Sequence, residues 1–452
     1  MDTKALRQKI LDLAIHGKLV PQDPNDEPAS VLLERIKAEK ERLIKEGKIK
    51  RSKKSAKTSD TPHYENVPFE VPDNWVWMTL GEVGTWQSGG TPSRSNKTYY
   101  GGNIPWLKTG DLNDGLISDI PESITEEAVA NSSAKINPAG SVLIAMYGAT
   151  IGKLGILTFP ATTNQACCAC IEFNAITQLY LFYFLLSQRN GFIAKGGGGA
   201  QPNISKEIIV NTFIPLPPLS EQQRIVMEIE KWFALIDQVE QGKADLQNTI
   251  KQTKSKILDL AIHGKLVPQD PNDEPAIKLL KRINPDFTPC DNGHYTQLPD
   301  GWTFCRLDQI IGYEQSTAYI VESTAYDDSY STPVLTAGKS FIIGYTNEAT
   351  GIYSNLPCII FDDFTTDSKL VDFPFKVKSS AMKILKVHKD IEVDYVAMFM
   401  SITKLVGDTH KRYWISEYSK LEIPIPSKAE QKRIIHAIHG IFTQLDLIME
   451  SL

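Results

Sequence analysis

The hydrophobic pattern of the chain is most regular between Leu219 and Pro268, where apolar residues recur at steps of four and three. A spacing of about 3.5 residues is the heptad repeat of a helix that lays a narrow apolar stripe against a partner helix. The apolar seam residues of this central helix are Ile225, Ile229, Trp232, Ile236, Val239, Leu246, Ile250, Ile257 and Leu260, with Lys243 and Thr253 at the two remaining positions.

Signals for both ends of the central helix stand in the sequence. Ser220 followed by Gln223 matches a capping box, and Gly264 followed by Pro268 matches a helix stop. About forty residues at ~1.5 Å each make a rod of roughly 60 Å, longer than the helices of ordinary domains. The pattern therefore predicts a spacer between two globular lobes.

Two internal repeats indicate where the partner helix comes from. The string KILDLAIHGKLVPQDPNDEPA begins at Lys9 and again at Lys256, and AEQKRIIHAIHG from Ala429 resembles SEQQRIVMEIEK from Ser220. The two chain ends thus form a split copy of the central helix, which predicts a pseudo-twofold, circular organisation. The seam residues of the split copy are Leu6, Ile10, Leu13, Ile434, Ile438, Ile441, Leu445 and Ile448.

Two lobes with matching boundaries lie between the repeats. The first opens on VPDNW (Val71–Trp75) and the second on LPDGW (Leu298–Trp302), and each closes on an alternating strand that contains prolines. Between these boundaries the sequences diverge almost completely, as expected of related modules that read different targets. The predicted domains are 1–20 and 429–452 (split helix), 21–67 and 268–297 (connectors), 68–218 and 298–428 (lobes) and 219–267 (central helix).

Composition limits the class of protein. At 452 residues the chain is too long for one core, its 42% apolar content is that of a globular protein, and no apolar run reaches a membrane span. Six cysteines make no disulfide framework at this length, which favours a reducing cytoplasm. The net charge of −6 does not exclude DNA binding, because local patches set that interaction. The basic segment Lys48–Lys57 is either a solvated linker or a phosphate-contacting arm.

Motifs for catalysis are weak. The segment Gly148–Lys153 has three residues between its glycines and lacks the Ser or Thr after the lysine of a P-loop. Asp362, Asp363 and Asp367 are a candidate metal cluster for nuclease chemistry, or else a capped turn or a surface whose carboxylates accept from cytosine amino groups. The CCAC run from Cys167 lacks the second ligand pair of a zinc site. We therefore expect a non-catalytic chain without a metal or cofactor of its own.

Polar residues on the predicted loops suit contacts to DNA base edges. Arg and Lys donate to guanine in the major groove, and Asn and Gln pair with adenine. The candidate DNA-binding residues are Arg94, Lys108, Lys153, Asn164, Gln165, Gln201 and Asn203 in the first lobe, and Lys339, Tyr345, Lys369, Lys411, Arg412 and Trp414 in the second.

Nearly the whole chain resembles the specificity subunit of Type I restriction–modification enzymes. The resemblance rests on Trp75 with Leu80-Gly81-Glu82, Ile104-Pro105-Trp106 with Gly110-Asp111, Gly148–Gly155 with Thr163-Asn164-Gln165, PLPPLSEQQRI at Pro215–Ile225, and LAIHGKLVPQ at Leu13 and Leu260. It implies two target-recognition domains, each reading half of a split site in double-stranded DNA. It also implies two copies of a methylation subunit, which carries S-adenosylmethionine, and a restriction (motor–nuclease) subunit.

The sequence therefore predicts an α/β (α+β) fold with two target-recognition domains separated by a long antiparallel two-helix coiled coil. The predicted function is DNA sequence recognition by a non-catalytic cytoplasmic subunit with no membrane partner. Two alternatives stay open, namely an architectural or regulatory DNA-binding protein and a metal-dependent nuclease that uses the aspartates of the second lobe. Co-purification of a methylation subunit, or metal-dependent cleavage by the isolated chain, discriminates among them.

Overall fold

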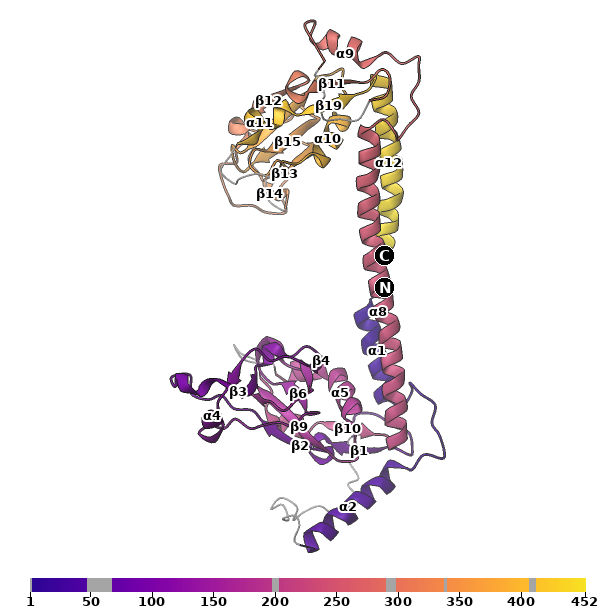
Figure 1. Cartoon of the computed structure of the whole chain (residues 1–452), viewed down its shortest axis with the longest axis vertical. Helices are drawn as coiled ribbons and strands as arrows, with labels where there is room; N and C mark the ends of the chain where they lie inside the picture. The colour runs from indigo at the N-terminus through magenta and orange to yellow at the C-terminus, as the bar shows by residue number, and fades with distance from the viewer. Residues whose placement is uncertain (1, 47–66, 197–202, 290–297, 337–339, 406–411) are drawn as a thin grey trace. The chain divides into compact units, whose positions relative to one another are not determined.

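The long helix α8 runs without a break over Leu219–Ile262 in the computed structural model (Figure 1). The structure describes residues 2–46, 67–196, 203–289, 298–336, 340–405 and 412–452, without the side chains of residues 39, 40, 43 and 44. The chain divides into two compact units, Met1–Gln241 and Gly242–Leu452, so that each unit contains one half of α8. Within the described residues, no helix has the length and apolarity needed to cross a membrane.

Both ends of α8 are defined by specific contacts. After the helix, Gly264 adopts a φ of +62° and the Lys265 amide donates to the Leu260 carbonyl at 2.8 Å, which ends the helix as predicted. The predicted capping box is wrong. The helix begins one residue before Ser220, whose hydroxyl lies in the first turn and donates to Asp26 of the connector.

In the first unit, α1 (Thr3–Ile15) packs antiparallel to the N-terminal half of α8. Arg7, near the start of α1, ion-pairs with Asp237 at 2.6 Å. Gln22, beyond the end of α1, donates to Glu221 in the first turn of α8 at 2.7 Å. The two helices therefore run in opposite directions, as the split repeat predicts.

In the second unit, α12 (Lys428–Ser451) packs antiparallel to the C-terminal half of α8. Lys254 ion-pairs with Asp446 near the end of α12. Gln269, beyond the end of α8, donates to Glu430 in the first turn of α12 at 3.1 Å. The same helix pairing is thus built twice, once in each unit.

The predicted seam is only partly correct, because some of its residues are exposed. The predicted seam residues that are buried or partly buried are Leu6, Ile10, Leu13, Ile225, Ile229, Ile236, Ile250, Ile257, Leu260, Ile434, Ile438 and Leu445. Those that are exposed are Trp232, Val239, Leu246, Ile441 and Ile448. The neighbour of Trp232, Phe233, packs instead, and its ring meets Tyr183 of the lobe edge-on at 5.9 Å between centroids. The lobe as well as α1 therefore packs against α8, and the buried face of α8 is directed toward the lobe.

The described part of the first lobe forms three sheets and several short helices. At its base β1 (Val76–Thr79) pairs antiparallel with β10 (Phe213–Leu216). The second sheet has the order β2 (Gly84–Ser88), β9 (Cys167–Phe173), β6 (Val142–Ala145), β7 (Leu154–Leu157) and β4 (Gly115–Ile117), and the third has the order β5 (Ser123–Ile124), β3 (Tyr100–Leu107) and β8 (Thr162–Thr163). The α-helices of the connector and lobe are α2 (Ala29–Lys45), α3 (Leu80–Val83), α4 (Glu126–Ala130), α5 (Gln178–Ser187), α6 (Arg189–Lys195) and α7 (Lys206–Val210).

The described strands of the second lobe follow the same topology despite the different sequence, except that β4 has no counterpart. Its base pair is β11 (Thr303–Arg306) with β19 (Glu422–Ile425). The next sheet has the order β12 (Ile311–Gln315), β18 (Met382–Val387), β15 (Cys358–Asp362) and β16 (Ser368–Val371), and the third has the order β14 (Ile342–Thr346), β13 (Thr332–Leu335) and β17 (Lys376–Val377). The α-helices are α9 (Ala276–Ile283), α10 (Val393–Ile402) and α11 (Tyr413–Ser416). In both third sheets the middle strand pairs antiparallel with one neighbour and parallel with the other.

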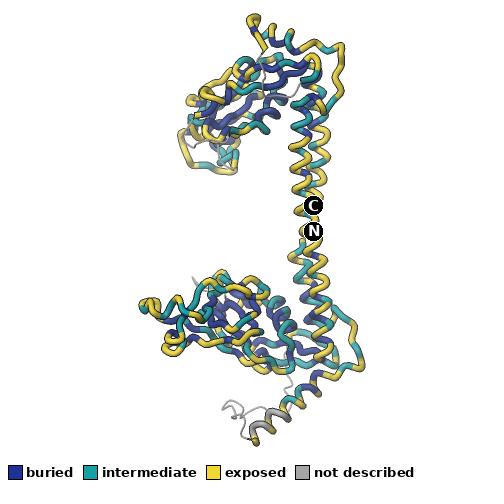
Figure 2. Tube along the Cα trace, in the orientation of Figure 1, coloured by how far each residue is buried: buried dark blue, intermediate teal, exposed yellow. Residues whose placement is uncertain are grey.

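Buried residues gather inside each lobe and extend onto its half of α8 (Figure 2). In the first unit the core runs from the strands through Trp75 to Ile225 and Ile229 of α8. In the second it runs through Trp302 to Ile434 and Ile438 of α12. The largest hydrophobic core of each unit is therefore shared by the lobe and its helix pair, which fixes the lobe on its own half of α8.

A buried carboxylate joins each lobe to its helices. In the first joint, Glu221 accepts from the indole nitrogen of Trp75 at 3.0 Å and from the amide of Gln22 at 2.7 Å. The second joint consists of Glu430, Trp302 and Gln269, with distances of 3.0 and 3.1 Å. Burial raises the pKa of both carboxyls. The repeated sequence strings thus hold together three segments that are distant in the chain.

Candidate nucleic-acid interface

Parallel strands β3 and β8 end side by side in the first lobe, and two candidate DNA-binding residues follow them directly. The strands pair through Leu107 and Thr163, so that Lys108 and Asn164 come next to each other. The Asn164 amide donates to the Leu107 carbonyl at 2.9 Å, which continues the pairing past the strand ends. Lys108 is half-buried, as is Asn164.

The end of β6 brings further polar residues to the same place. The Met146 amide donates to the Ala166 carbonyl at 2.8 Å, and Tyr147 pairs with Asn203 in an isolated bridge. Gln165, Asn203 and Tyr147 are all exposed. These three segments therefore converge beside the ends of β3 and β8.

Lys153 reaches this region through the turn between β6 and β7. Its carbonyl accepts from the Ala145 amide at 2.9 Å, at the end of β6. Arg189 holds the turn, because its Nε donates to the Gly152 carbonyl at 2.9 Å while its guanidinium ion-pairs with Asp114. We call the group formed by Lys108, Lys153, Asn164, Gln165 and Asn203 the polar end of the first lobe.

Arg94 lies beside the polar end in a cage of aromatic rings and one carboxylate. Its guanidinium carbon stands 4.6 Å from the ring centre of Tyr100 and 5.0 Å from that of Trp106. Glu122 ion-pairs with Arg94 at 3.3 Å and also with Lys108. The hydrogen bond from Lys108 lowers the pKa of the Glu122 carboxyl. Two cations are thus preoriented, which favours directed hydrogen bonding over loose phosphate attraction.

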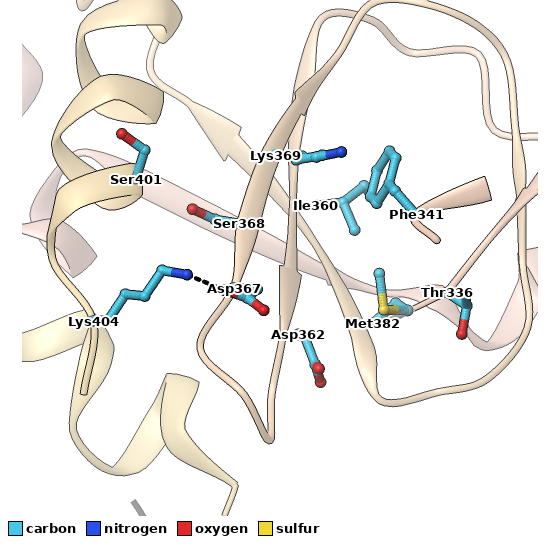
Figure 3. A pocket seen from close by; sticks show the side chains of 10 residues that line it. All are labelled: Thr336, Phe341, Ile360, Asp362, Asp367, Ser368, Lys369, Met382, Ser401 and Lys404. Atoms are coloured by element: carbon cyan, nitrogen blue, oxygen red, sulfur yellow. Dashed lines mark hydrogen bonds and ion pairs between the residues drawn. The ribbon is translucent and has the colours of Figure 1, made fainter. Parts of the chain in front are cut away.

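The candidate residues of the second lobe do not form one group. Lys369 lies on β16 with its ammonium 4.5 Å from the ring centre of Phe341, beside a cavity of about 360 Å³ (Figure 3). Arg412 is exposed, whereas Tyr345 is half-buried on β14, paired with Pro333 toward the other end of β13.

The prediction that Trp414 contacts DNA is corrected by its burial. Its side chain is 2% exposed, and its ring packs on Phe361 and Tyr418 with centroids 5.2 and 6.1 Å away. Its backbone amide donates to Asp363 at 2.8 Å. An aromatic residue in a polar loop segment looks exposed from sequence, but here it fills the core. Gln201, Lys339 and Lys411 lie outside the described residues.

The three aspartates of the second lobe face different partners. Asp362 is buried and accepts from the Thr365 hydroxyl, Asp363 lies 3.5 Å from the buried ammonium of Lys383, and Asp367 ion-pairs with Lys404. Among the residues that the structure describes, no His, Cys, Asp and Glu side chains are grouped as a metal site. Cys168 and Cys170 lie in buried strand β9, where burial raises the pKa of each thiol to about 12. The capped-turn interpretation therefore fits Asp362 best.

Sequence reasoning missed Glu122 and Tyr147, which belong to the surface around the polar end. Neither carries a local signal, because their importance arises from contacts between segments far apart in the chain. The described groups here are donors and acceptors on loops held by a rigid sheet. Such an arrangement suits hydrogen bonding to the surface of a bound partner.

Comparisons with known proteins agree with this picture. The family model described as Type I restriction modification DNA specificity domain matches residues 72–248. The chain is 31% identical to the EcoAI specificity subunit of Escherichia coli over 70% of this chain and 64% of that protein. It is 29% identical to the EcoEI specificity subunit of the same species over 99% of this chain and 90% of that protein.

Two further similarities are more local or concern the fold alone. The EcoR124I/EcoR124II specificity subunit of Escherichia coli is 52% identical over 126 residues, which is 26% of this chain and 31% of that protein. A solved chain from a study of assembly and conformational transition in the type I R-M system superposes with a TM-score of 0.62 at 17% identity, covering 85% of this chain and 94% of its own. The predicted α/β architecture with a long central helix is confirmed.

Proposed function

The chain belongs to the specificity subunits of Type I restriction–modification enzymes, and from this premise we propose that it reads a bipartite, asymmetric DNA site with its two lobes. The observation that carries the proposal is that one strand topology, apart from β4, is built twice with different polar groups on it. Two readers of the same shape but different chemistry recognise two different half-sites. Because Lys108 and Arg94 are preoriented by Glu122, the first lobe reads bases as well as phosphates.

The helices supply the docking surface for the partner subunits. Trp232 and Val239 are exposed on α8, and the corresponding positions of α12, Ile441 and Ile448, are exposed apolar residues too. Exposed apolar residues that recur in both units suit two copies of one partner. That partner is the methylation subunit, which binds S-adenosylmethionine and performs the methyl transfer, and the restriction subunit joins the same assembly in the cytoplasm. This chain contributes recognition and no catalysis.

The experiment that tests the proposal is a methylome of cells that express this chain with its methylation subunit. Single-molecule sequencing should show one bipartite methylated motif that vanishes without this chain. Replacing residues 72–217 by the corresponding lobe of a relative should change one half of the motif and leave the other intact. If both halves change, or if neither does, the two-reader proposal is wrong. Magnesium-dependent cleavage by the isolated chain would instead support a nuclease.

A further inference from the structure

Backbone hydrogen bonds give a residue-by-residue equivalence between the lobes that their sequences conceal. In the first lobe the Asn164 amide donates to the Leu107 carbonyl at 2.9 Å, and in the second the Lys378 amide donates to the Leu335 carbonyl at 2.8 Å. Both bonds continue the parallel pairing of the third sheet, β3 with β8 and β13 with β17. Lys378 therefore occupies the place of Asn164.

Two further pairs of equivalent backbone hydrogen bonds locate the remaining positions. The Ala145 amide donates to the Lys153 carbonyl at 2.9 Å, and the Asp362 amide donates to the Asp367 carbonyl at 2.8 Å. Asp367 therefore stands where the first lobe has Lys153. The bond from Ile204 to Met146 (2.9 Å) likewise matches that from Tyr413 to Asp363 (3.0 Å), which aligns Asn203 with Arg412.

The polar end of the second lobe is thus formed by Asp367, Lys378 and Arg412, all of them exposed. The Asp367 side chain is 54% exposed and ion-pairs with Lys404, just beyond α10. Figure 3 shows Lys404 reaching toward Asp367 at the cavity that Lys369 also lines. The position that carries the cation Lys153 in the first lobe thus carries a carboxylate, Asp367, in the second, and Lys404 ion-pairs with that carboxylate.

We infer that Asp367 and Lys378 are specificity-determining residues of the second lobe, with Asp367 accepting from the amino group of cytosine or adenine and Lys378 donating to guanine. This inference rests on the proposed function. A carboxylate beside DNA is repelled by phosphates, so it lowers affinity for every sequence except one that offers it a donor. In the major groove those donors are the cytosine N4 and adenine N6 amino groups. Lys404 acts as a positioning residue, because its ion pair holds the carboxylate in one place.

The test measures methylation by the full complex on a library of randomised sites, read by single-molecule sequencing. Asp367→Asn and Lys378→Ala should each reduce discrimination at one base pair of one half-site by about tenfold, the effect of about 1.4 kcal/mol. The other half-site should be unchanged. Asp372→Asn is the matched control, because it removes the same charge from an exposed residue at the opposite end of β16 and should change nothing.

Lys404 is tested by a conservative pair. Lys404→Met should reduce discrimination at the same base pair as Asp367→Asn does, whereas Lys404→Arg, which keeps the positive charge, should keep the wild-type discrimination. Unaltered selectivity in both Asp367→Asn and Lys378→Ala, with a normal wild-type motif, overturns the inference and leaves the proposed function standing. A wild-type complex that methylates no bipartite motif overturns the proposed function and the inference with it.

Discussion

The two joints and the two polar ends of this protein are duplicated to very different degrees. At the joints, Glu221 and Glu430 each bind an indole nitrogen at 3.0 Å and a glutamine amide from the connector. At the polar ends the same backbone hydrogen bonds carry Lys153 in one lobe and Asp367 in the other. The backbone is equivalent in both places, whereas side-chain chemistry is equivalent only where it is buried.

Burial explains the difference. A fully buried glutamine follows each joint carboxylate and accepts from a backbone amide at the start of a lobe helix. Gln222 accepts from the Thr177 amide, and Gln431 accepts from the Glu392 amide. A substitution there leaves several polar groups without partners, each at a cost of about 1–3 kcal/mol. An exposed loop residue has no such constraint, so the lobes differ in what they recognise without losing their attachment.

The largest effect is expected from removing the joint tryptophans. Trp75→Ala and Trp302→Ala each leave a large cavity and a buried carboxylate without its indole donor. Each should destabilise its own unit by about 3–5 kcal/mol. Hydrogen exchange resolved by mass spectrometry would measure the two units separately. A large loss in one unit beside a negligible loss in the other would show that the joints are not equivalent.

A smaller loss of stability is expected from substitutions at Gly17 and Gly264, the glycines that follow the ends of α1 and α8. Gly17 and Gly264 have φ of +66° and +62°, and an added Cβ would lie 2.5 Å from Pro72 or 2.4 Å from Pro299. Alanine at either position should cost about 2 kcal/mol from backbone strain alone. Gly242→Ala is the control with opposite sign, because that site in mid-helix is open and alanine favours the helix. Thermal denaturation of the three variants measures the contrast.

The joint carboxylates predict a pH dependence. Burial raises the pKa of Glu221 and Glu430 above the ordinary value of 4.5, so the folded chain keeps their protons to higher pH than the unfolded chain. The resulting stabilisation is complete below pH 4.5 and is lost as pH rises through the folded pKa. Glu221→Gln and Glu430→Gln should each flatten this decline in a series of thermal denaturation curves. Curves that keep the wild-type slope would contradict it.

The smallest effect concerns the charges at the polar ends. Lys153→Ala should lower the slope of log affinity against log salt concentration by about one if the ammonium contacts a phosphate. Asp367→Ala should steepen the slope, because it releases Lys404 from its ion pair. Titrations of the assembled complex on its own site at several salt concentrations measure both slopes. Equal shifts in one direction would mean that the two ends do not differ electrostatically toward DNA.

The sequence by itself determined the parts that depend on local pattern and repetition. The heptad spacing located α8, Gly264 located its end, and the repeated strings from Lys9 and Lys256 predicted antiparallel helix pairs. The matching openings that end in Trp75 and Trp302 lie directly before β1 and β11, the first strand of each lobe. These features were readable because helix periodicity and glycine conformation act over a few residues.

Only the tertiary structure decided which surfaces face inward and which residues correspond. The spacing of apolar residues gives the period of a helix but does not say which face is buried. Phe233 packs against Tyr183 of the lobe, whereas its neighbour Trp232 is exposed. Trp414 was buried by rings distant in sequence, and Asp367 was aligned with Lys153 by backbone bonds alone. Contacts between remote segments depend on the whole packed core, which no local pattern records.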